Sequence, residues 1–261
     1  MSDILEELTA LRREDAANRE KGMPFDELMR LADAMPPALD FAAAFRGRGT
    51  GVIAELKKAS PSEGLIREDF RPAELAKELE AAGASALSVL CEPHRFLGGE
   101  EYLKAARKVV SLPILYKDFI STPYQIAAAR VAGADAVLLI AAVLDDAALS
   151  GLLAFARSLG LSALVETHDA CEIDRAVKSG ARLIGVNCRN LRNFTCDTGL
   201  IESLIGRIPR PCLRIAESGM HTRDAILRAR AAGADGFLVG TALMRSPSPG
   251  RTLTEITASS H

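Results

Sequence analysis

The chain has 261 residues, of which 48% are hydrophobic and 25% are charged, and its formal net charge at pH 7 is -2. These values are ordinary for a soluble globular protein, and without a basic block no nucleic-acid partner is expected. No apolar run approaches the roughly 18–20 residues of a membrane span, and the charged N-terminus lacks the apolar core of a signal peptide.

The first segment, residues 1–46, has a charged, helical pattern that begins MSDILEELTALRREDAANREK. We expect it to form one or two helices that pack on the rest of the chain, where they could lie over one end of it. The GRGTG sequence at 47–51 is typical of a linker. The expected organisation is therefore an N-terminal helical extension at 1–46 and one larger catalytic domain at 47–261.

A pattern of helix end, Gly-Ala turn and short apolar strand recurs four times in the larger domain. The copies are AAGASALSVL at 81–90, VAGADAVLLI at 131–140, KSGARLIGVN at 178–187 and AAGADGFLVG at 231–240. Glycine just past a helix is a common helix terminator. The copies lie about 50 residues apart, which leaves room for two strand–helix units in each period.

Other apolar segments supply the intervening strands, namely VIAELK, PILYK, SALVE and CLRIAES. In chain order, strands are predicted near residues 54, 88, 115, 138, 164, 185, 215 and 238, with amphipathic helices between them. This α/β alternation predicts a parallel sheet, and eight units in about 200 residues predict a (β/α)8 TIM barrel. An open doubly wound sheet is the alternative, but no G-x-G-x-x-G follows the first strand.

The cysteines and histidines show no metal-binding pattern. Five cysteines, at positions 91, 171, 188, 196 and 212, are irregularly spaced and include no C-x-x-C pair. We therefore expect reduced cysteines that serve as small buried apolar residues in a cytoplasmic protein. The four histidines lack metal-site spacing. His168 follows Glu166 by two residues and could line the mouth of the barrel or cap a loop.

Polar side chains stand at the carboxyl ends of several predicted strands, where barrels of this kind carry their chemistry. In chain order they are Glu55, Lys57, Lys117, Glu166, Asn187, Arg189, Glu217 and Ser218. Residues two apart on a strand share a face, so Glu55 and Lys57 point the same way. Because isolated buried charges are costly, these residues predict a cluster whose members shift each other's pKa values. A buried polar network that only closes the barrel is the alternative.

The loops after the last two predicted strands indicate an anion site. Ser218-Gly219 follows the seventh strand, and Gly240-Thr241 begins a short helix after the eighth. Loops in these two positions commonly bind phosphate through backbone N–H groups, and Ser60 could close around the same ligand. Plain turns are the alternative. Phe96 and Phe119 follow the second and third strands, where they could wall an apolar pocket or pack under a loop.

Motifs in a fixed order resemble those of the indole-3-glycerol phosphate synthase family. They are AELKKASPSEG, LPILYKDFI, LVETHD, LIGVNCRNL, AESGM and FLVGTALMR. They cover essentially the whole barrel, and the helical N-terminal segment is also similar to the family's. Three positions depart from the pattern. LCEPHRF lacks the family's frequent Thr-Asp or Thr-Glu pair, Tyr116 replaces a frequent Arg, and Cys188 replaces the usual Asn or Ser.

The resemblance implies an enzyme of tryptophan biosynthesis, a carboxy-lyase. Its substrate would be 1-(2-carboxyphenylamino)-1-deoxyribulose 5-phosphate, and its products indole-3-glycerol phosphate, carbon dioxide and water. Neither a metal nor an organic cofactor is implied. The implied protein is a monomer that acts on a phosphorylated small molecule, without nucleic acid or membrane.

The resemblance also implies residue roles. The lysine of the KDF motif, here Lys117, protonates the substrate ketone during ring closure. Lys57 suits the proton donation that releases the hydroxyl group, and Glu166 suits the matching acid–base work. Glu55 holds Lys57, and the order of the late proton transfers stays open. The remaining implied contacts are Asn187, Arg189 and Glu217 for substrate positioning, Ser60, Ser218, Gly219, Gly240 and Thr241 for phosphate, and Phe96, Phe119 and Leu138 for the anthranilate ring.

Two other functions are weighed against this one. A phosphoribosylanthranilate isomerase-like barrel would share the phosphate site but would use a Cys/Asp pair, without lysines on the first and third strands. The presence of Lys57 and Lys117 argues against it. A barrel that binds a phosphorylated ligand without turnover is the second, and the presence of Lys117 and Glu166 argues against that one.

Overall fold

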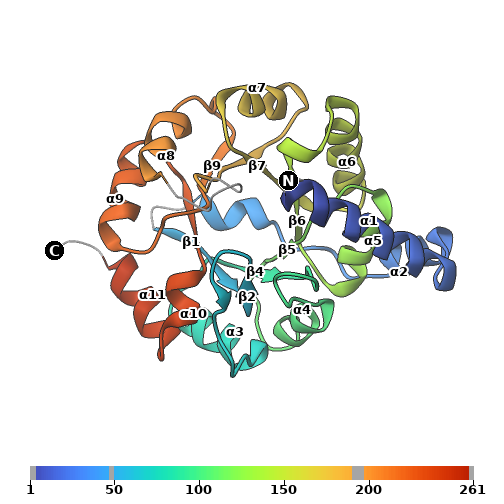
Figure 1. Cartoon of the computed structure of the whole chain (residues 1–261), viewed down its shortest axis with the longest axis horizontal. Coiled ribbons are helices and arrows are strands. Elements are labelled where there is room, and N and C mark those ends of the chain that lie inside the picture. The colour runs from blue at the N-terminus through green and yellow to red at the C-terminus, as the bar shows by residue number, and fades with distance from the viewer. Residues whose placement is uncertain (1–3, 47–49, 190–196, 259–261) are drawn as a thin grey trace.

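The computed structural model describes residues 4–46, 50–189 and 197–258. Within this part of the chain, eight parallel strands close into a barrel in the order β1-β10-β9-β8-β7-β6-β5-β4, ringed by helices (Figure 1). The strands are β1 (Gly51–Leu56), β4 (Ala86–Leu90), β5 (Ile114–Lys117), β6 (Ala136–Ile140), β7 (Ser162–Thr167), β8 (Leu183–Val186), β9 (Leu213–Ala216) and β10 (Gly236–Val239). The predicted TIM barrel is confirmed, and every expected strand position lies in a strand.

Helices cover the outside of the barrel. They are α3 (Pro72–Ala81), α4 (Glu100–Arg107), α5 (Pro123–Ala132), α6 (Asp146–Ser158), α7 (Ala170–Lys178), α8 (Thr198–Ile205), α9 (Arg223–Ala231) and α11 (Pro249–Thr257). Shorter elements follow three of the strands. They are a hairpin of β2 (Ala59–Ser60) and β3 (Gly64–Leu65), the 3-10 turn η2 (Ala141–Val143) and the short helix α10 (Thr241–Arg245). The hairpin carries Ser60 and was not predicted from the sequence.

The recurring Gly-Ala turn connects helix ends to strands. Gly83, Gly133, Gly180 and Gly233 have φ angles of 92°, 94°, 86° and 107°, a left-handed conformation that favours glycine. After Gly133, for example, the N–H of Ala134 donates to the carbonyl of Ala129, and the other three turns repeat this bond. It is the bond that ends a helix in a Schellman turn. The repeat in the sequence is therefore a repeated helix terminator.

Two apolar layers hold the barrel together. Along β6, Val137 and Leu139 belong to the layer between strands and helices, whereas Leu138 belongs to the barrel interior. The interior also contains Ile53, Leu115, Leu164, Leu183, Ile215 and Leu238, one from each of six further strands. This alternation follows from the two-residue period of a strand.

The N-terminal segment reaches both ends of the barrel. It contains α1 (Ile4–Gly22), α2 (Phe25–Asp33) and the 3-10 helix η1 (Phe41–Phe45). Leu5 and Leu8 of α1 join the interior cluster beside Phe119, at the carboxyl end of the strands. Phe41 and Phe45 of η1 join the same cluster from the opposite end. Helices over the mouth were expected, but the plug formed by η1 was not predicted.

Close contact with glycines places η1 at the amino end. A Cβ atom at Gly51 or Gly236 would lie only 2.8 or 2.6 Å from the Phe45 ring. These glycines begin β1 and β10. Phe45 therefore fills a space that exists because both strands start with glycine.

The cysteines differ from expectation. Cys91 and Cys212 are free and buried, as predicted, but Cys171 is free and exposed. Cys188 is buried and disulfide-bonded, so the expectation of a reduced residue is wrong at this position. Cys196 lies outside the described residues.

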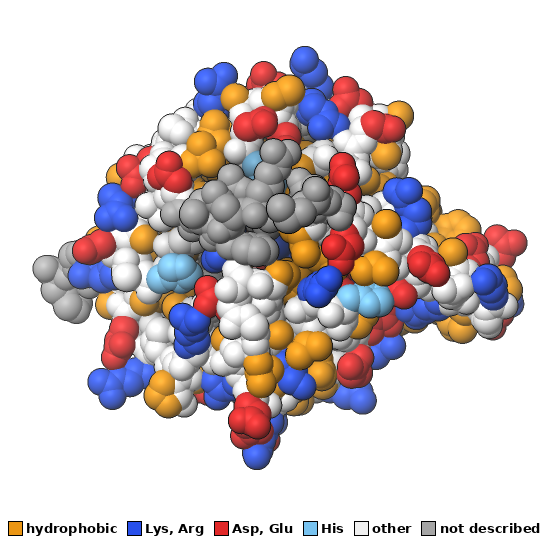
Figure 2. All heavy atoms as spheres, viewed as in Figure 1, with side chains coloured by type: hydrophobic (Ala, Val, Ile, Leu, Met, Phe, Trp, Pro, Cys, Tyr) orange, Lys and Arg blue, Asp and Glu red, His pale blue; other side chains and the backbone are white. Residues whose placement is uncertain are grey.

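The face shown in Figure 2 carries acidic and basic side chains mixed around its rim, with apolar side chains between them. No large patch of one charge is visible on the described part of this face. In the described ranges, no helix is both long enough and apolar enough to cross a membrane.

Candidate active site

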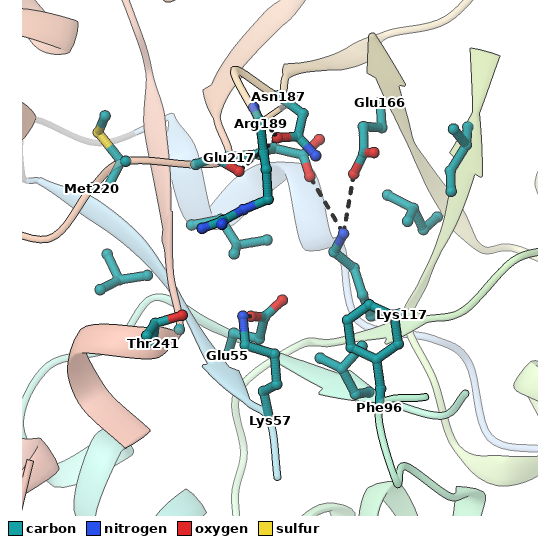
Figure 3. Close-up of a pocket in the computed structure, with 18 of the residues that line it drawn as sticks. Glu55, Lys57, Phe96, Lys117, Glu166, Asn187, Arg189, Glu217, Met220 and Thr241 are labelled. Carbon is teal, nitrogen blue, oxygen red and sulfur yellow. Dashed lines mark hydrogen bonds and ion pairs between the residues drawn. The ribbon is translucent and has the colours of Figure 1, made fainter. Parts of the chain in front are cut away.

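The carboxyl ends of the strands surround a pocket of about 850 Å³. The predicted residues that line it are Glu55, Lys57, Phe96, Lys117, Phe119, Leu138, Glu166, Asn187, Arg189, Glu217, Ser218, Gly219, Gly240 and Thr241. Ser60 lines an adjoining pocket of about 450 Å³, which shares Lys57 and Arg189 with the first. The structure therefore brings all of the predicted site residues to one end of the barrel (Figure 3).

Lys117 lies between two buried carboxyl groups. Its Nζ is 3.1 Å from Glu166 Oε2 and 3.6 Å from Glu217 Oε2. Burial lowers the pKa of the Lys117 ammonium group, but the negative charges of Glu166 and then Glu217 outweigh burial and raise that pKa above its usual value. At neutral pH this side chain is therefore a cation that points into the pocket, as Figure 3 shows.

The two carboxyl groups beside Lys117 have opposite proton affinities. Burial raises the pKa of Glu166, but Lys117 and the neighbouring His168 outweigh burial and hold the pKa well below its usual range. Burial and the negative charge of Glu166 raise the pKa of Glu217 well above its usual range. The pKa values of the two carboxyl groups are therefore shifted in opposite directions, which is a common arrangement for general acid–base chemistry.

A second ion pair lies across the pocket. Lys57 Nζ is 2.8 Å from Glu55 Oε2, and Glu55 is only 4% exposed. The two residues share a face of β1, as their spacing predicted, and both line the pocket. The sequence places opposite charges in a core strand because its carboxyl end is the wall of this pocket.

Glycines make room for the carboxyl groups. A Cβ atom at Gly240 would overlap the Glu55 carboxylate, and one at Gly185 would overlap the Glu217 carboxyl group. Both glycines come at the carboxyl ends of strands, in β8 and directly after β10. Their lack of a side chain lets acidic groups enter the barrel interior.

The loops after β8, β9 and β10 form a polar end of the pocket. Asn187 Oδ1 accepts hydrogen bonds from Ser218 Oγ at 2.6 Å and from the Arg189 N–H at 3.0 Å. The Arg189 guanidinium donates to Ser62 Oγ in the hairpin after β1, at 3.4 Å. Gly219 has a φ of +76°, so its turn favours glycine. Three loops that are distant in sequence are thereby held together.

This polar end is electropositive. His221 lines the pocket, and its pKa is lowered by burial and then by the positive charges of Arg189 and Lys57. Thr241 begins α10, with Gly240 preceding it as the N-cap residue. Positive charge together with open backbone N–H groups suits an anionic ligand group. His221 is not among the site residues predicted from the sequence, although it adjoins the AESGM motif.

The opposite end of the pocket is apolar. The rings of Phe96 and Phe119 have centroids 6.1 Å apart, and Leu138 lies on the pocket wall with them. Leu5 of α1 also lines this pocket. The N-terminal extension therefore contributes directly to the site.

Glu92 shapes the loop that carries Phe96. Its buried carboxylate accepts backbone hydrogen bonds from His94 at 2.6 Å and from Arg95 and Phe96, both at 2.8 Å. Its role was missed because a loop-capping contact depends on backbone directions that sequence alone does not show.

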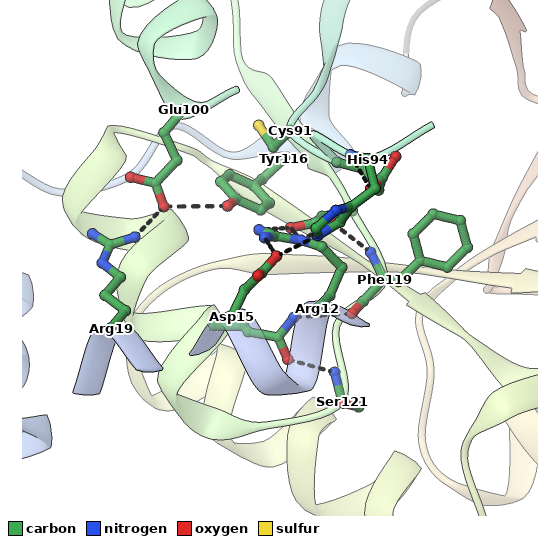
Figure 4. A network of polar contacts seen from close by, with 12 residues as sticks. Arg12, Asp15, Arg19, Cys91, His94, Glu100, Tyr116, Phe119 and Ser121 are labelled. Carbon is green, nitrogen blue, oxygen red and sulfur yellow. Dashed lines mark hydrogen bonds and ion pairs between the residues drawn. The ribbon is translucent and has the colours of Figure 1, made fainter. Parts of the chain in front are cut away.

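Ion pairs anchor α1 over the pocket (Figure 4). The Arg12 guanidinium donates to both Asp118 oxygens, at distances between 2.7 and 3.0 Å. Asp118 is buried and directly follows Lys117. Asp15 pairs with His94 Nε2 at 2.8 Å. The helix is thus tied to the loops after both β4 and β5, next to the predicted catalytic lysine.

In the described residues, no group of three or more His, Cys, Asp or Glu side chains is placed to hold a metal ion.

Comparison with known proteins shows the family. The sequence model of the family described as indole-3-glycerol phosphate synthase matches residues 5–256. A relative with that name from Albidiferax ferrireducens is 46% identical over 99% of both chains. Another, from Laribacter hongkongensis, is 46% identical and aligns over 99% of this chain and 100% of its own.

Solved structures of more distant proteins share the fold. The thiamine phosphate pyrophosphorylase from Pyrococcus furiosus has a TM-score of 0.59 at 15% identity and covers 79% of this chain and 93% of its own. The orotidine 5'-phosphate decarboxylase from Pyrococcus horikoshii has a TM-score of 0.59 at 17% identity, covering 79% of this chain and 97% of its own. At such low identity these structures support the barrel alone. The near full-length family match and the 46% identical relatives show that the chain belongs to the indole-3-glycerol phosphate synthase family.

Proposed function

We propose that this protein converts 1-(2-carboxyphenylamino)-1-deoxyribulose 5-phosphate into indole-3-glycerol phosphate, carbon dioxide and water. The observation that carries the proposal is the position of Lys117, whose ammonium group lies between the buried carboxyl groups of Glu166 and Glu217 in the pocket. An apolar wall stands at one end of that pocket and an electropositive end at the other. The substrate has a matching order, with an aromatic ring, a reactive ketone and a phosphate.

The two ends of the pocket suggest one substrate orientation. The anthranilate ring would lie against Phe96, Phe119 and Leu138, which bury apolar surface. The phosphate would lie in the loops of Ser218, Gly219, Gly240 and Thr241, with Ser60 closing from the hairpin after β1. The ketone then falls near the ammonium group of Lys117.

Ring closure needs a proton donor at the ketone. The aromatic carbon that carries the carboxylate attacks the ketone carbon, and negative charge develops on the ketone oxygen. The Lys117 ammonium gives its proton to that oxygen, which becomes a hydroxyl group. Loss of carbon dioxide then returns its bonding electrons to the ring and restores aromaticity.

The final step removes water. The hydroxyl group leaves with a second proton, and a base takes a proton from the carbon attached to nitrogen. Two protons are thus donated and one is removed, so each turnover of the ionised substrate takes up one proton from solvent. Lys57, held by Glu55 at 2.8 Å, is our candidate donor. The Glu166 carboxylate is our candidate base, while Asn187, Arg189 and Glu217 position the substrate.

The other barrel functions fit this site less well. An isomerase-like barrel with a Cys/Asp pair has no use for two lysines on β1 and β5. A barrel that only binds a phosphorylated ligand has no use for two buried carboxyl groups with opposite pKa shifts beside one ammonium group. For the same reaction, we also propose a cytoplasmic monomer that uses no added metal.

The test supplies the purified protein with the carboxyphenylamino-deoxyribulose phosphate in metal-free buffer and identifies the product by mass spectrometry. The proposal predicts a product lighter than the substrate by one carbon dioxide and one water. It also predicts uptake of one proton per turnover, measured with a pH indicator in weak buffer, after correction for hydration of the released carbon dioxide. Unchanged substrate with a folded protein would contradict the proposal. Conversion of phosphoribosylanthranilate instead would favour the isomerase.

A further inference from the structure

His168 occupies a position that the proposed steps do not use. It directly follows β7, and its Nε2 lies 3.4 Å from Glu166 Oε1. The other oxygen of the same carboxylate, Oε2, is the one bonded to Lys117 Nζ. His168 is not among the described residues that line the pocket. It therefore contacts Glu166 without being part of the pocket lining.

Glu172 holds the imidazole in this orientation. Its Oε2 lies 3.1 Å from His168 Nδ1 and also accepts the His168 backbone N–H at 2.8 Å. Glu172 belongs to the first turn of α7, four residues after His168. Each ring nitrogen thus faces one carboxylate, an arrangement that favours the doubly protonated imidazolium.

The charge state of the imidazole agrees with this geometry. Burial lowers the pKa of His168, but its contacts with Glu166 and Glu172 outweigh burial and raise the pKa to about 10. The described titratable groups that face the ring are Glu166 from β7, Glu172 from α7 and, beyond Glu166, Glu217 after β9. At neutral pH the ring is a cation.

His168 makes the two carboxyl groups beside Lys117 unequal. Glu166 and Glu217 are both buried, and both lie within 4 Å of the same ammonium group. By ion-pair distance, Glu166 has two cationic neighbours among the described residues, Lys117 at 3.1 Å and His168 at 3.4 Å. Glu217 has Lys117 alone, at 3.6 Å. Two carboxyl groups this close share protons, and the extra cation favours ionisation of its own neighbour.

We propose that His168, oriented by Glu172, is a positioning residue that makes Glu166 the ionised member of the Glu166–Glu217 pair. It thereby decides which carboxyl group accepts a proton and which retains one during turnover. This inference rests on the proposed function, because the reaction is what requires a base and an acid side by side.

The test measures kcat and KM from pH 5 to pH 10 for the wild type and for His168→Gln, Glu172→Gln and His94→Gln. Gln at position 168 keeps a hydrogen-bond donor but not the positive charge. Glu166 then needs a higher pH to ionise. The fall of kcat on the acidic side of its pH profile, here called the acid limb, therefore moves to higher pH. We expect kcat of His168→Gln to fall about tenfold more at pH 5.5 than at pH 9, with KM changed by less than about twofold.

The other variants separate charge from structure. Glu172→Gln should move the acid limb in the same direction but less far. His94→Gln is the matched control, because it removes an imidazole that pairs with Asp15 at 2.8 Å outside the Glu166 cluster. Its acid limb should coincide with that of the wild type. A loss in His168→Gln that is uniform across pH would overturn the inference, since a purely structural role predicts that result.

A second measurement, which does not depend on enzyme activity, tests the inference even if a variant fails to fold. The ring proton signals of His168, followed by NMR during a pH titration of the wild type, should titrate far above the ordinary histidine range, and at lower pH in Glu172→Gln. Titration of wild-type His168 near 6.5, the ordinary histidine pKa, would overturn the inference even if the enzyme is active. Absence of product from a wild type with the expected titration would instead refute the proposed function.

Discussion

The two ends of the barrel solve the same packing problem with different groups. At the amino end, glycines at the starts of β1 and β10 make room for the ring of Phe45. At the carboxyl end, Gly185 and Gly240 make room for the carboxyl groups of Glu217 and Glu55. Glycines leave space at both ends. An aromatic ring occupies this space at the amino end, and carboxyl groups occupy it at the carboxyl end.

Two buried carboxyl groups, one at each end, differ in their hydrogen bonding. At the amino end, buried Asp135 accepts the backbone N–H groups of Leu39 and Ile114 and pairs with Arg107, each at 2.8 Å. At the carboxyl end, the Glu217 carboxyl oxygens have no hydrogen-bond partner in the described residues. Unsatisfied buried groups are costly and commonly mark functional sites. Asp135 therefore contributes to stability, whereas the unsatisfied Glu217 is placed for chemistry.

Removal of the plug should give the largest effect on stability. Phe41 is fully buried, so Phe41→Ala leaves a cavity and should lower the free energy of unfolding by about 3–5 kcal/mol. Urea unfolding measures this loss. Because the ring is at the end opposite the pocket, kcat of the folded variant should remain near that of the wild type. A large fall in kcat without loss of stability would show that the two ends are not separate in function.

A Gly→Ala substitution at each end tests whether the two ends differ in function. Gly185→Ala places a methyl group against the Glu217 carboxyl group and should lower kcat about 100-fold by displacing it, with a small effect on stability. Gly236→Ala places the same methyl group 2.6 Å from the Phe45 ring and should cost about 1–3 kcal/mol of stability with kcat retained. Kinetics and urea unfolding of both variants check the pair. The reverse pattern would contradict this assignment of the two ends.

The Glu55–Lys57 pair should affect rate more than binding. Glu55→Gln keeps the shape of the side chain but removes the charge that holds Lys57. We expect kcat to fall about tenfold or more while KM changes less, because the lost interaction acts on charge that develops during the reaction. Steady-state kinetics at pH 7.5 test this expectation. An increase in KM alone would assign the pair to substrate binding.

The smallest predicted effect is a pH dependence of stability. His168 has its pKa raised from 6.5 to about 10 in the folded protein, so its ion pairs contribute fully below pH 6.5 and are lost as the pH rises to 10. The difference in unfolding free energy between wild type and His168→Gln should therefore be larger at pH 6 than at pH 10. Urea unfolding at the two pH values measures it. A difference that grows toward pH 10 would contradict the assigned charge.

Much of this fold follows from local patterns in the sequence. The four Gly-Ala turns, each at a helix end, predict the alternation of helices and strands. In a (β/α)8 barrel the carboxyl ends of all strands lie at one rim, so residues distant in sequence, such as Lys117 and Glu166, are expected to lie close together. The ion pair at the end of β1 follows from its two-residue spacing. These features are predictable because each one depends on residues close together in the chain, combined with one rule of topology.

The features that were missed depend on contacts between distant segments. Nothing local to Phe41 and Phe45 shows that η1 lies under the barrel rather than over it. The loop-capping role of Glu92 depends on backbone N–H directions. The role of His168 was predictable in part, because its spacing from Glu166 and from Glu172 is visible in the sequence. Its contact with the carboxylate required the fold.

The most direct test of the account follows indole fluorescence after the carboxyphenylamino-deoxyribulose phosphate is mixed with wild type or Lys117→Ala, without added metal. The account predicts growing fluorescence from the wild type and a rate about 10²- to 10⁴-fold lower from Lys117→Ala, the range expected for loss of a general acid. The variant should keep the fold, judged by circular dichroism, and should still bind inorganic phosphate. Product formation by Lys117→Ala at the wild-type rate would contradict the claim that this lysine, at the charged end of the barrel, drives ring closure.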